Sequence, residues 1–239
     1  MISRSESKYI QTLSHKKQRN EEKLFVAEGP KLVDEVLHSK YIVQKIYATS
    51  SWTSDMVKSI PITVVTEDEL QKISAQQTAN QVLAIVEMPN DEHKIEVENK
   101  LSLVLDNIQD PGNFGTIIRI ADWFGINQII CSPDCVELYN PKVIQSTMGS
   151  FTRVNINYVE LAPALDQIKI PIYGALLNGK DVRTIAKPKE GLLIIGNEGK
   201  GISPHILPFI NNKISIAKIG NAESLNAAVA TGILLSHLV

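Results

Sequence analysis

The chain has 239 residues, of which 44% are hydrophobic and 21% are charged, and its formal net charge at pH 7 is -2. This is ordinary globular composition, which excludes disordered, collagen-like and coiled-coil proteins, and the length suits two domains better than one. The near-neutral charge also argues against a protein whose entire surface binds nucleic acid.

Neither a membrane span nor a metal site is predicted. No apolar run approaches the roughly 20 residues that cross a bilayer, and the first residues, MISRSESKYI, lack the apolar core of a secretory signal. We therefore expect a cytoplasmic protein without membrane contact. The two cysteines, Cys131 and Cys135, have no further pair of ligands at zinc-site spacing, and the five histidines stand singly. We expect no bound metal and a structural or incidental role for the cysteines.

The first 90 residues alternate β-rich runs with helical stretches. Strands are expected at LFVAE (24–28), IVQKIYA (42–48), ITVV (62–65) and QVLAIVE (81–87). Helices are expected at 30–39, where Pro30 suits the first turn, and at 67–74. Residues 1–90 are therefore predicted to form a small α/β domain.

Two further segments of this half are notable for their charge. The stretch from His15 to Arg19 is the densest basic region, and it could either meet RNA phosphates or be a solvated helix face. Residues 91–99 are polar and have no apolar period, so they are predicted to be a linker.

The second half, residues 100–239, is dominated by buried strands. They are expected at LSLVLD (101–106), NQIIC (127–131), IPIYGALL (170–177), GLLIIG (191–196) and NKISIA (212–217). Near-continuous apolar strands that alternate with helices predict an α/β fold, a mostly parallel sheet with helices on both faces. Ligands in such sheets bind at the carboxyl ends of the strands, so three loops there are of interest.

The first loop lies within residues 105–125 and leads through a Pro-Gly-Asn turn into a helix. One face of that helix is apolar, and it consists of Phe114, Ile117, Ile118, Ala121 and Phe124. Arg119 points roughly the opposite way, where it could reach a phosphate or a reacting group, although the helix alone favours the plainer interpretation as an ordinary surface arginine or a salt-bridge partner. Asn113 is either a site residue or a turn former or N-cap.

The second loop lies within residues 192–203 and carries Gly196, Gly199 and Gly201 after a buried strand. Glycines let a ligand approach the backbone and expose its amide donors. The loop is neither a P-loop nor a GxGxxG turn. Because Glu198 would repel a phosphate, the loop suits a neutral or cationic cofactor.

The third loop lies within residues 214–238, where a strand leads through Gly220 and Ser224 into the last helix. Small and apolar residues form one stripe of this helix: Leu225, Ala228, Val229, Gly232 and Ile233. The stripe suits close packing on the sheet or on another subunit. The plainer interpretation is a packing helix that Ser224 caps.

Together and in this order, the loops resemble the three signature motifs of the SpoU (TrmH-like) RNA 2'-O-ribose methyltransferases, within the SPOUT superfamily. The matching segments are NFGTIIRIAD (113–122), GNEGKG (196–201) and ESLNAAV (223–229). The segment LFVAEGPKLVDEVL (24–37) resembles the opening of the L30e-like substrate-binding domain that often precedes such catalytic domains. The resemblance implies a trefoil knot, a homodimer and the cofactor S-adenosylmethionine.

The resemblance also implies roles for individual residues. Arg119 would be the catalytic arginine, and the rest of the polar constellation would be Asn113, Glu198, Ser224 and Asn226. The cofactor would be held, largely by backbone groups and apolar contacts, at Leu177, Asn178, Gly196, Asn197, Glu198, Gly201, Ile216, Ala217, Ser224 and Leu225. The third motif departs slightly, with Ala227 and Ala228 where many relatives have Val and Ser.

The implied reaction is methyl transfer from S-adenosylmethionine to a ribose 2'-hydroxyl of ribosomal or transfer RNA. RNA is favoured over DNA because DNA lacks that hydroxyl. The alternative is a non-catalytic RNA-binding protein that uses the L30e-like domain, but Asn113, Arg119 and Glu198 are all intact. A dehydrogenase is disfavoured because no dinucleotide fingerprint is present.

Overall fold

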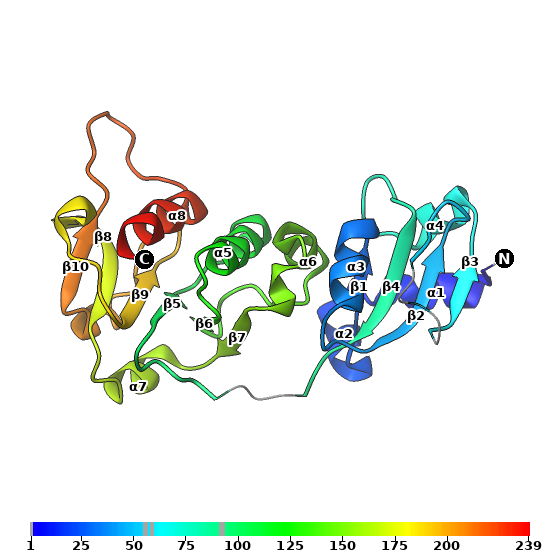
Figure 1. Ribbon diagram of the computed structural model, residues 1–239, viewed down its shortest axis with the longest axis horizontal. Helices are drawn as coiled ribbons and strands as arrows, with labels where there is room; N and C mark the ends of the chain where they lie inside the picture. The colour runs from blue at the N-terminus through cyan, green and yellow to red at the C-terminus, as the bar shows by residue number, and fades with distance from the viewer. Residues whose placement is uncertain (1, 55–56, 58–59, 91–93) are drawn as a thin grey trace. The chain divides into compact units, whose positions relative to one another are not determined.

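A computed structural model of the protein describes residues 2–54, 57, 60–90 and 94–239, which fall into two compact units (Figure 1). The first unit comprises Met1–Asp91 and Leu138–Thr152, and the second comprises Glu92–Glu137 and Arg153–Val239. None of the helices in the described ranges combines the length and apolar character that a bilayer crossing demands.

The first unit is built on a four-stranded mixed sheet. Its strands, in spatial order, are β1 (Leu24–Glu28), β4 (Val82–Glu87), β2 (Val43–Ala48) and β3 (Ile62–Val64). Strand β4 runs antiparallel to both β1 and β2, whereas β3 runs parallel to β2. The four predicted strands are confirmed, with shifts of a residue at their ends, and β1 is left as an edge strand.

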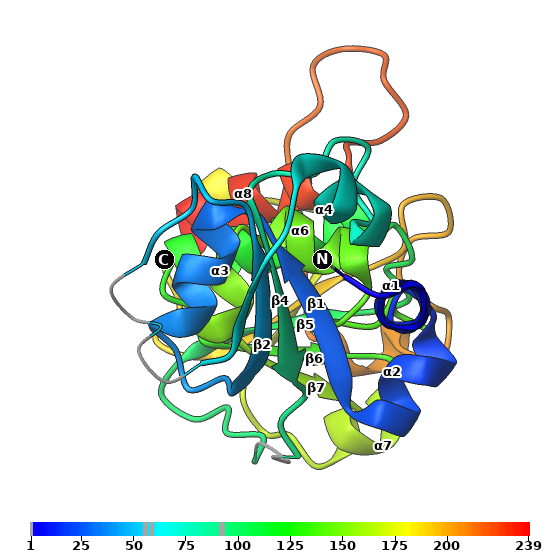
Figure 2. The same ribbon diagram turned by 90° about the vertical axis from the view of Figure 1, so that its right-hand side faces the viewer.

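Helices cover both faces of this sheet, as Figure 2 shows for α3 and α1. The helices are α1 (Arg4–Thr12), α2 (Lys16–Glu22), α3 (Pro30–Leu37) and α4 (Glu67–Ile73). Ile10 of α1 and Ile73 of α4 belong to one hydrophobic core cluster with Leu83 of β4. Helix α4 begins in a capping box, in which Thr66 and Glu69 each accept a hydrogen bond from the other's backbone N–H.

The structure corrects one expectation about the basic stretch. Arg19 is only 2% exposed, and its guanidinium donates hydrogen bonds to the carbonyl oxygens of Leu13 and Ser14. It therefore stabilises the turn between α1 and α2 and is not available to phosphates. Lys16 and Lys17 remain exposed on α2.

The segment Leu138–Thr152, which the sequence places in the second domain, packs on the first unit. It contains α6 (Pro141–Thr147) and a short 3-10 turn, η1 (Ser150–Thr152). The ring of Phe25 on β1 lies 4.7 Å from Tyr139 and 5.8 Å from Phe151, between ring centroids, and Phe151 also contacts Tyr41. This segment thus completes an aromatic core that residues 1–90 do not fill alone.

The second unit is built on a six-stranded sheet in which every neighbouring pair is parallel. The strands, in spatial order, are β10 (Asn212–Ser215), β8 (Ile172–Asp181), β9 (Gly191–Ile195), β5 (Leu101–Leu105), β6 (Gln128–Cys131) and β7 (Asn155–Tyr158). The five predicted strands are confirmed. Strand β7 was not predicted, because its sequence NINY is short, largely polar and not fully buried anywhere along its length.

Helices lie on both faces of this sheet, as predicted (Figure 1). On one side α5 (Pro111–Trp123) packs against α8 (Ala227–Leu238). On the other side α7 (Leu161–Asp166) and the turn η3 (Leu207–Phe209) cover a cluster that includes Val104, Ile130 and Ile194. The trefoil knot implied by the family resemblance stays a prediction.

Helix α8 differs from its expected form in two ways. Its N-cap is Asn226 and not Ser224. The side-chain oxygen of Asn226 accepts hydrogen bonds from the backbone N–H groups of Ala228 and Val229. Its buried face consists of Ala227, Ala228, Thr231, Leu234, Leu235 and Leu238. The predicted stripe therefore lies mostly at the margin of this face, and Val229 is half-exposed.

Residues 91–93 of the predicted linker lie outside the described residues. Residues 94–99 form no helix or strand. The side chains of Ile95 and Val97 pack against the core of the second unit, and the backbone N–H of Glu96 donates to the side chain of Gln128. This part of the linker is therefore attached to the second unit.

Candidate active site

The three predicted loops all leave the sheet of the second unit at the same edge, because its strands are parallel. The first follows β5, the second follows β9, which is the neighbour of β5, and the third follows β10. Side-chain hydrogen bonds join the three loops. The amide nitrogen of Asn113 donates to Glu198 Oε1 at 2.7 Å, and the amide nitrogen of Asn226 donates to Asn113 Oδ1 at 2.8 Å.

Asn113 is held in this position by the start of α5. The N-cap of the helix is Asp110, whose carboxylate accepts a hydrogen bond from the backbone N–H of Asn113 at 2.7 Å, and Pro111 occupies the first turn. The interpretation of Asn113 as an N-cap is therefore wrong. Its side chain is free to bridge Glu198 and Asn226, which both belong to other loops.

Arg119 lies on α5, six residues after Asn113 and hence about 9 Å further along the helix axis. The opposite face of α5 is buried through Phe114, Ile117 and Ile118, whereas Arg119 is exposed, as predicted. It forms no hydrogen bond or ion pair with any residue that the structure describes. Its guanidinium is thus free to bind a ligand, but it is not part of the Asn113 network.

A buried carboxylate ties the first loop to the second. Asp106, at the end of β5, is only 3% exposed, and it accepts hydrogen bonds from the backbone N–H of Ser203 at 2.6 Å and from its hydroxyl at 3.1 Å. Beside it, the side-chain amide of Asn197 donates to the carbonyl oxygen of Asn107 at 2.8 Å. These bonds fix both ends of the loop that carries Glu198.

The second loop turns back on itself immediately after β9. Asn197 and Gly201 exchange two backbone hydrogen bonds, at 2.9 and 3.0 Å, which closes a tight turn around residue 198. A Cβ atom on Gly196 would lie 2.3 Å from the carbonyl carbon of Gly201, so no other residue fits there without moving the turn. The predicted need for glycine at Gly196 is therefore explained by close approach of the backbone to itself.

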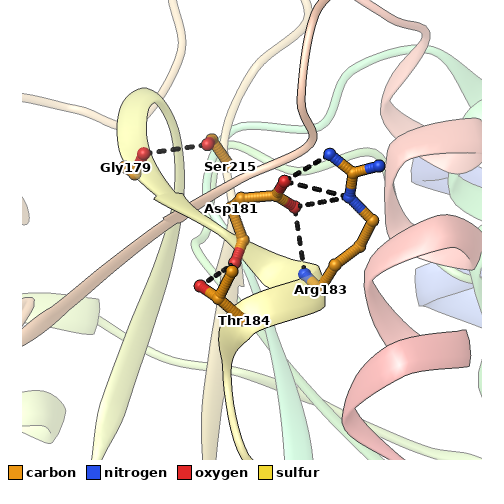
Figure 3. Close-up of polar contacts among 5 residues, drawn as sticks. All are labelled: Gly179, Asp181, Arg183, Thr184 and Ser215. Carbon is orange, nitrogen blue, oxygen red and sulfur yellow. Dashed lines mark hydrogen bonds and ion pairs between the residues drawn. The ribbon is translucent and has the colours of Figure 1, made fainter.

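The remaining candidate cofactor residues come from β8 and from the chain after β10. The hydroxyl of Ser215 donates to the carbonyl oxygen of Gly179 at 2.9 Å (Figure 3). At Gly179 a Cβ would lie 2.4 Å from the carbonyl carbon of Ile214, so the two strands touch backbone to backbone. Between Gly174 and Lys180, β8 leaves the regular register with β10.

The close approach of β8 and β10 brings two pairs of predicted cofactor residues to one end of the sheet. Leu177 and Asn178 lie in the irregular part of β8, directly before Gly179, and Ile216 and Ala217 directly follow Ser215. Leu177 is 82% exposed, and Asn178 and Ala217 are exposed as well. Exposed apolar residues at a loop cluster are typical of a surface that a ligand or partner covers.

The turn after β8 is closed by an ion pair that the sequence analysis did not single out. Asp181 caps the 3-10 turn η2 (Val182–Thr184), and its carboxylate accepts hydrogen bonds from both the guanidinium and the backbone N–H of Arg183 (Figure 3). The hydrogen bond from the Arg183 guanidinium holds the pKa of the Asp181 carboxyl below its usual value. Arg183 is therefore engaged in shaping this turn.

The third loop is the most open of the three. Residues 217–226 are all exposed, Ile219 is 97% exposed and Leu225 is 47% exposed. The side chain of Ser224 makes no hydrogen bond within the described part of the chain. Ser224 and Leu225 are thus close in sequence to Asn226, which belongs to the hydrogen-bond network, but the structure does not connect their own side chains to that network.

The cysteines lie beneath the first loop. Cys135 Sγ accepts a hydrogen bond from the backbone N–H of Ile108 at 3.3 Å, and the hydroxyl of Ser132 accepts one from the backbone N–H of Asn107 at 2.9 Å. The hydrogen bond from Cys131, followed by smaller contributions from Ser132 and the backbone, lowers the pKa of the Cys135 thiol to about 7. These contacts support the structural role expected for the pair.

The sequence analysis missed the roles of Asp106 and Asn107, which hold the first loop to the second, and of Asp110, which caps α5. Asp106 and Asn107 directly follow the buried strand β5. That position was a usable signal, because a carboxylate that is buried at a strand end requires hydrogen-bond donors from a neighbouring loop.

Comparison with known protein families assigns the chain to a family. The model of the SpoU rRNA Methylase family matches residues 100–236, which is more than half of the chain. The chain belongs to the SpoU rRNA methylase family. A second model, the MRM3-like substrate binding domain, matches residues 5–84 of this SpoU methylase.

Individual relatives agree with the family assignment. The protein is similar to a 23S rRNA (guanosine(2553)-2'-O)-methyltransferase of Bacillus subtilis, with 34% identity over 232 residues that cover 95% of this chain and 92% of the relative. A solved structure of a TrmH family protein from Porphyromonas gingivalis has 33% identity and a TM-score of 0.87, covering 100% of this chain and 98% of that one. An AdoMet-bound rRNA methyltransferase from Sinorhizobium meliloti has 26% identity and a TM-score of 0.86, covering 100% and 96%.

Proposed function

We propose that the protein transfers a methyl group from S-adenosylmethionine to a ribose 2'-hydroxyl of ribosomal or transfer RNA. The observation that carries this proposal is the bridge from Asn226 through Asn113 to Glu198, which joins the three motif loops, with Arg119 on the exposed face of α5. The activity of the Bacillus subtilis relative and the cofactor bound to the Sinorhizobium meliloti relative support the same reaction.

The residues at the loop cluster fit a cofactor that carries both a cation and an apolar ring. Glu198 supplies a carboxylate, which suits a sulfonium better than a phosphate. Leu177 and Leu225 supply exposed apolar surface for an adenine, and the backbone at Gly201, where a Cβ would meet nothing within 4 Å, is open to close approach. We propose that these residues bind the cofactor, and that further residues of the same loops also contact it: Asn178, Gly196, Asn197, Ile216, Ala217 and Ser224.

When bound, S-adenosylmethionine supplies an activated methyl group. The tasks of the protein are then to position the ribose and to lower the cost of removing the hydroxyl proton. Positioning of two reactants can contribute roughly 7–11 kcal/mol, whereas a proton acceptor adds about 10²- to 10⁴-fold, so positioning dominates. Arg119 contacts the 2'-oxygen and a neighbouring phosphate, and its positive charge stabilises the developing alkoxide.

Asn113, Glu198 and Asn226 act together to shape the site. Because Asn113 donates to Glu198 and accepts from Asn226, a shift of any one loop changes the position of the other two. Glu198 and Ser224 keep unused hydrogen-bonding capacity that can orient the ribose. Arg119 does not act as a base, because a guanidinium holds its protons too tightly.

The first unit binds the RNA, and residues 1–90 form most of it; the match to a substrate-binding domain and the exposed Lys16 and Lys17 support this role. The second unit forms a homodimer. Exposed apolar side chains on the packed helices α5 and α8 support this: Trp123 is 86% exposed and Val229 is 51% exposed. We place the reaction in the cytoplasm, where the RNA substrates are made and assembled.

The proposed function is tested by incubating the protein with total RNA and S-adenosylmethionine that carries a labelled methyl group. The labelled RNA is then digested, and ribose methylation is mapped by mass spectrometry. The expected result is one labelled ribose in ribosomal or transfer RNA. If the protein binds RNA and the cofactor but labels no nucleotide, it is a non-catalytic RNA-binding protein.

A further inference from the structure

The first unit contains a cavity of about 110 Å³ on the face of its sheet that α1 and α4 cover. Two of its lining residues belong to the edge strand β1, and its apolar walls come from Ile10, Val26 and Ile73. Its volume exceeds the space of a single water molecule several-fold, and it is well below the size of a drug-sized ligand site. A flat ring of the size of one nucleobase is a suitable occupant.

One carboxylate makes this cavity chemically unusual. Glu28, at the end of β1, lines the cavity and is only 7% exposed. Its Oε1 accepts a hydrogen bond from the backbone N–H of Ala75 at 2.9 Å, and its Oε2 accepts one from the hydroxyl of Ser74. A carboxylate has about four acceptor positions, so each oxygen can still accept a hydrogen bond from a ligand.

We propose that this cavity receives one unstacked guanine of the RNA substrate, whose two neighbouring N–H donors bind the two carboxylate oxygens of Glu28. The proposal rests on the proposed function, since it requires that RNA is the partner of the first unit. Single-stranded RNA is commonly recognised by bases that are splayed out and hydrogen-bonded along their Watson–Crick edge.

The acceptor pattern selects guanine among the four bases. The Watson–Crick edge of guanine carries two adjacent donors, N1–H and the N2 amine, which match two parallel acceptors. Adenine and cytosine offer one amine beside a ring acceptor, which would face the second oxygen of Glu28 without a hydrogen bond. Uracil offers one N–H between two carbonyl oxygens, which the carboxylate repels.

Exposed lysines lie close in sequence to the residues that line the cavity. Gln11 and Ser14 line the cavity from α1 and the turn after it, and the exposed Lys8, Lys16 and Lys17 flank them in sequence. The side chain of Gln11 also donates to the carbonyl oxygen of Lys72, which joins the two walls of the mouth. Lysines in this position attract phosphates without selecting a base, so the selection falls to Glu28.

The test uses the full-length protein and fluorescent 11-residue oligouridine that carries guanosine, inosine or uridine at its centre. Binding is measured by fluorescence anisotropy at one fixed salt concentration and without cofactor. The guanosine oligomer is expected to bind roughly five- to 150-fold more tightly than the all-uridine oligomer. Inosine, which lacks the N2 amine, is expected to lose most of this preference.

Two variants and a matched control test whether the preference for guanosine depends on Glu28 and on the cavity. Glu28→Gln places an amide donor in the cavity and is expected to abolish the preference for guanosine. Ala75→Leu keeps the carboxylate and the backbone donor but adds three carbon atoms to the lining of the cavity, and it is expected to weaken the preference strongly by obstructing the base. Glu67→Gln removes an equal charge from an exposed position on α4 and should keep the preference.

Several results would overturn the proposal: a wild-type protein without preference for guanosine, a preference that survives Glu28→Gln, or one that survives Ala75→Leu. If Glu28→Gln fails to fold by circular dichroism, the Ala75→Leu variant decides alone. The assay needs no methyl transfer, so a protein that prefers guanosine but methylates nothing refutes the proposed function and leaves this site intact. A protein that methylates RNA without the preference does the reverse.

Discussion

The side-chain amide of Asn113 and the carboxylate of Glu198 meet at 2.7 Å across 85 residues of sequence. Asn113 lies in the first turn of α5, which follows β5, and Glu198 lies in the loop that follows the neighbouring parallel strand β9. Asn226 extends the same chain of hydrogen bonds to a third loop. The site therefore depends on contacts between loops as well as on the strands that carry them.

Asn113→Ala should lower methyl transfer by roughly 10- to 100-fold, because a hydrogen bond to a charged group contributes about 1.5–3 kcal/mol. Asn113→Asp should be worse, since it places two carboxylates within hydrogen-bond distance. Steady-state kinetics with labelled cofactor measure both effects, and thermal melting controls for the fold. Equal activity of the two variants would show that the contact with Glu198 has no role in the reaction.

Asp106→Ala should weaken cofactor binding by roughly 10- to 100-fold, because the buried N–H of Ser203 loses its acceptor, at a cost of about 1–3 kcal/mol, and the second loop loosens. Ser203→Ala removes only the hydroxyl bond and serves as the milder comparison. Isothermal titration calorimetry measures the dissociation constant of S-adenosylmethionine. Asp106 would not be a positioning residue if both variants bound the cofactor as the parent does.

Phe151→Ala should destabilise the first unit by about 3–5 kcal/mol, although residue 151 lies far from residues 1–90 in sequence, because its ring packs on Phe25 and Tyr41. A Trp123→Phe background leaves Trp52, in the first unit, as the only tryptophan. Urea unfolding followed by its fluorescence then reports on that unit.

Tyr139→Phe is the control for this experiment. It keeps the ring and removes one hydroxyl bond, so it should cost about 1 kcal/mol. An unchanged unfolding midpoint in Phe151→Ala would mean that Leu138–Thr152 is not part of the first unit.

Features of the fold that depend on residues close in sequence could be predicted, whereas those that depend on contacts between distant segments could not. The strands at 101–105 and 191–195 carry a continuous apolar pattern, so they could be located to within one residue at their ends. Strand β7 has no such pattern, and the packing of Phe151 on Phe25 depends on long-range contacts that no local period reports. The helix caps show the same limit. Asp110 caps α5 and Asn226 caps α8, whereas Asn113 and Ser224 were the expected alternatives. The choice depends on which side chain a neighbouring loop engages.

The placement of the candidate site residues was predictable to the same degree. The motif residues Asn113, Glu198 and Asn226 do converge, and Arg119 is exposed as its position on the helix indicated. Asp106 escaped notice because its role becomes visible only when Ser203 is placed beside it.

Burial raises the pKa of Glu28, which outweighs the opposite effect of its hydrogen bonds from Ser74 and Ala75. The folded state then holds this proton more tightly than the unfolded state does. The contribution of Glu28 to stability is therefore full below its ordinary pKa of 4.5 and is lost as the pH rises through the raised value. Glu28→Gln does not titrate, so its stability relative to the parent should increase over that interval.

Urea unfolding at pH 4 and pH 7, again followed by Trp52 fluorescence, measures this difference. Glu67→Gln, which makes the same substitution at an exposed position on α4, is the matched control. If the stability of Glu28→Gln relative to the parent falls or stays level between pH 4 and pH 7, the raised pKa is contradicted.

The central claim is that Arg119 acts on the ribose while other residues hold the cofactor, and a single variant separates these roles. Arg119→Ala is measured twice, by single-turnover methyl transfer to the mapped RNA and by calorimetric titration with S-adenosylmethionine, with Arg119→Lys as the charge-preserving comparison. We predict that Arg119→Ala abolishes transfer, that Arg119→Lys retains little of it, and that both bind the cofactor as the parent does. Transfer at the parental rate in Arg119→Ala, or loss of cofactor binding, would contradict the account.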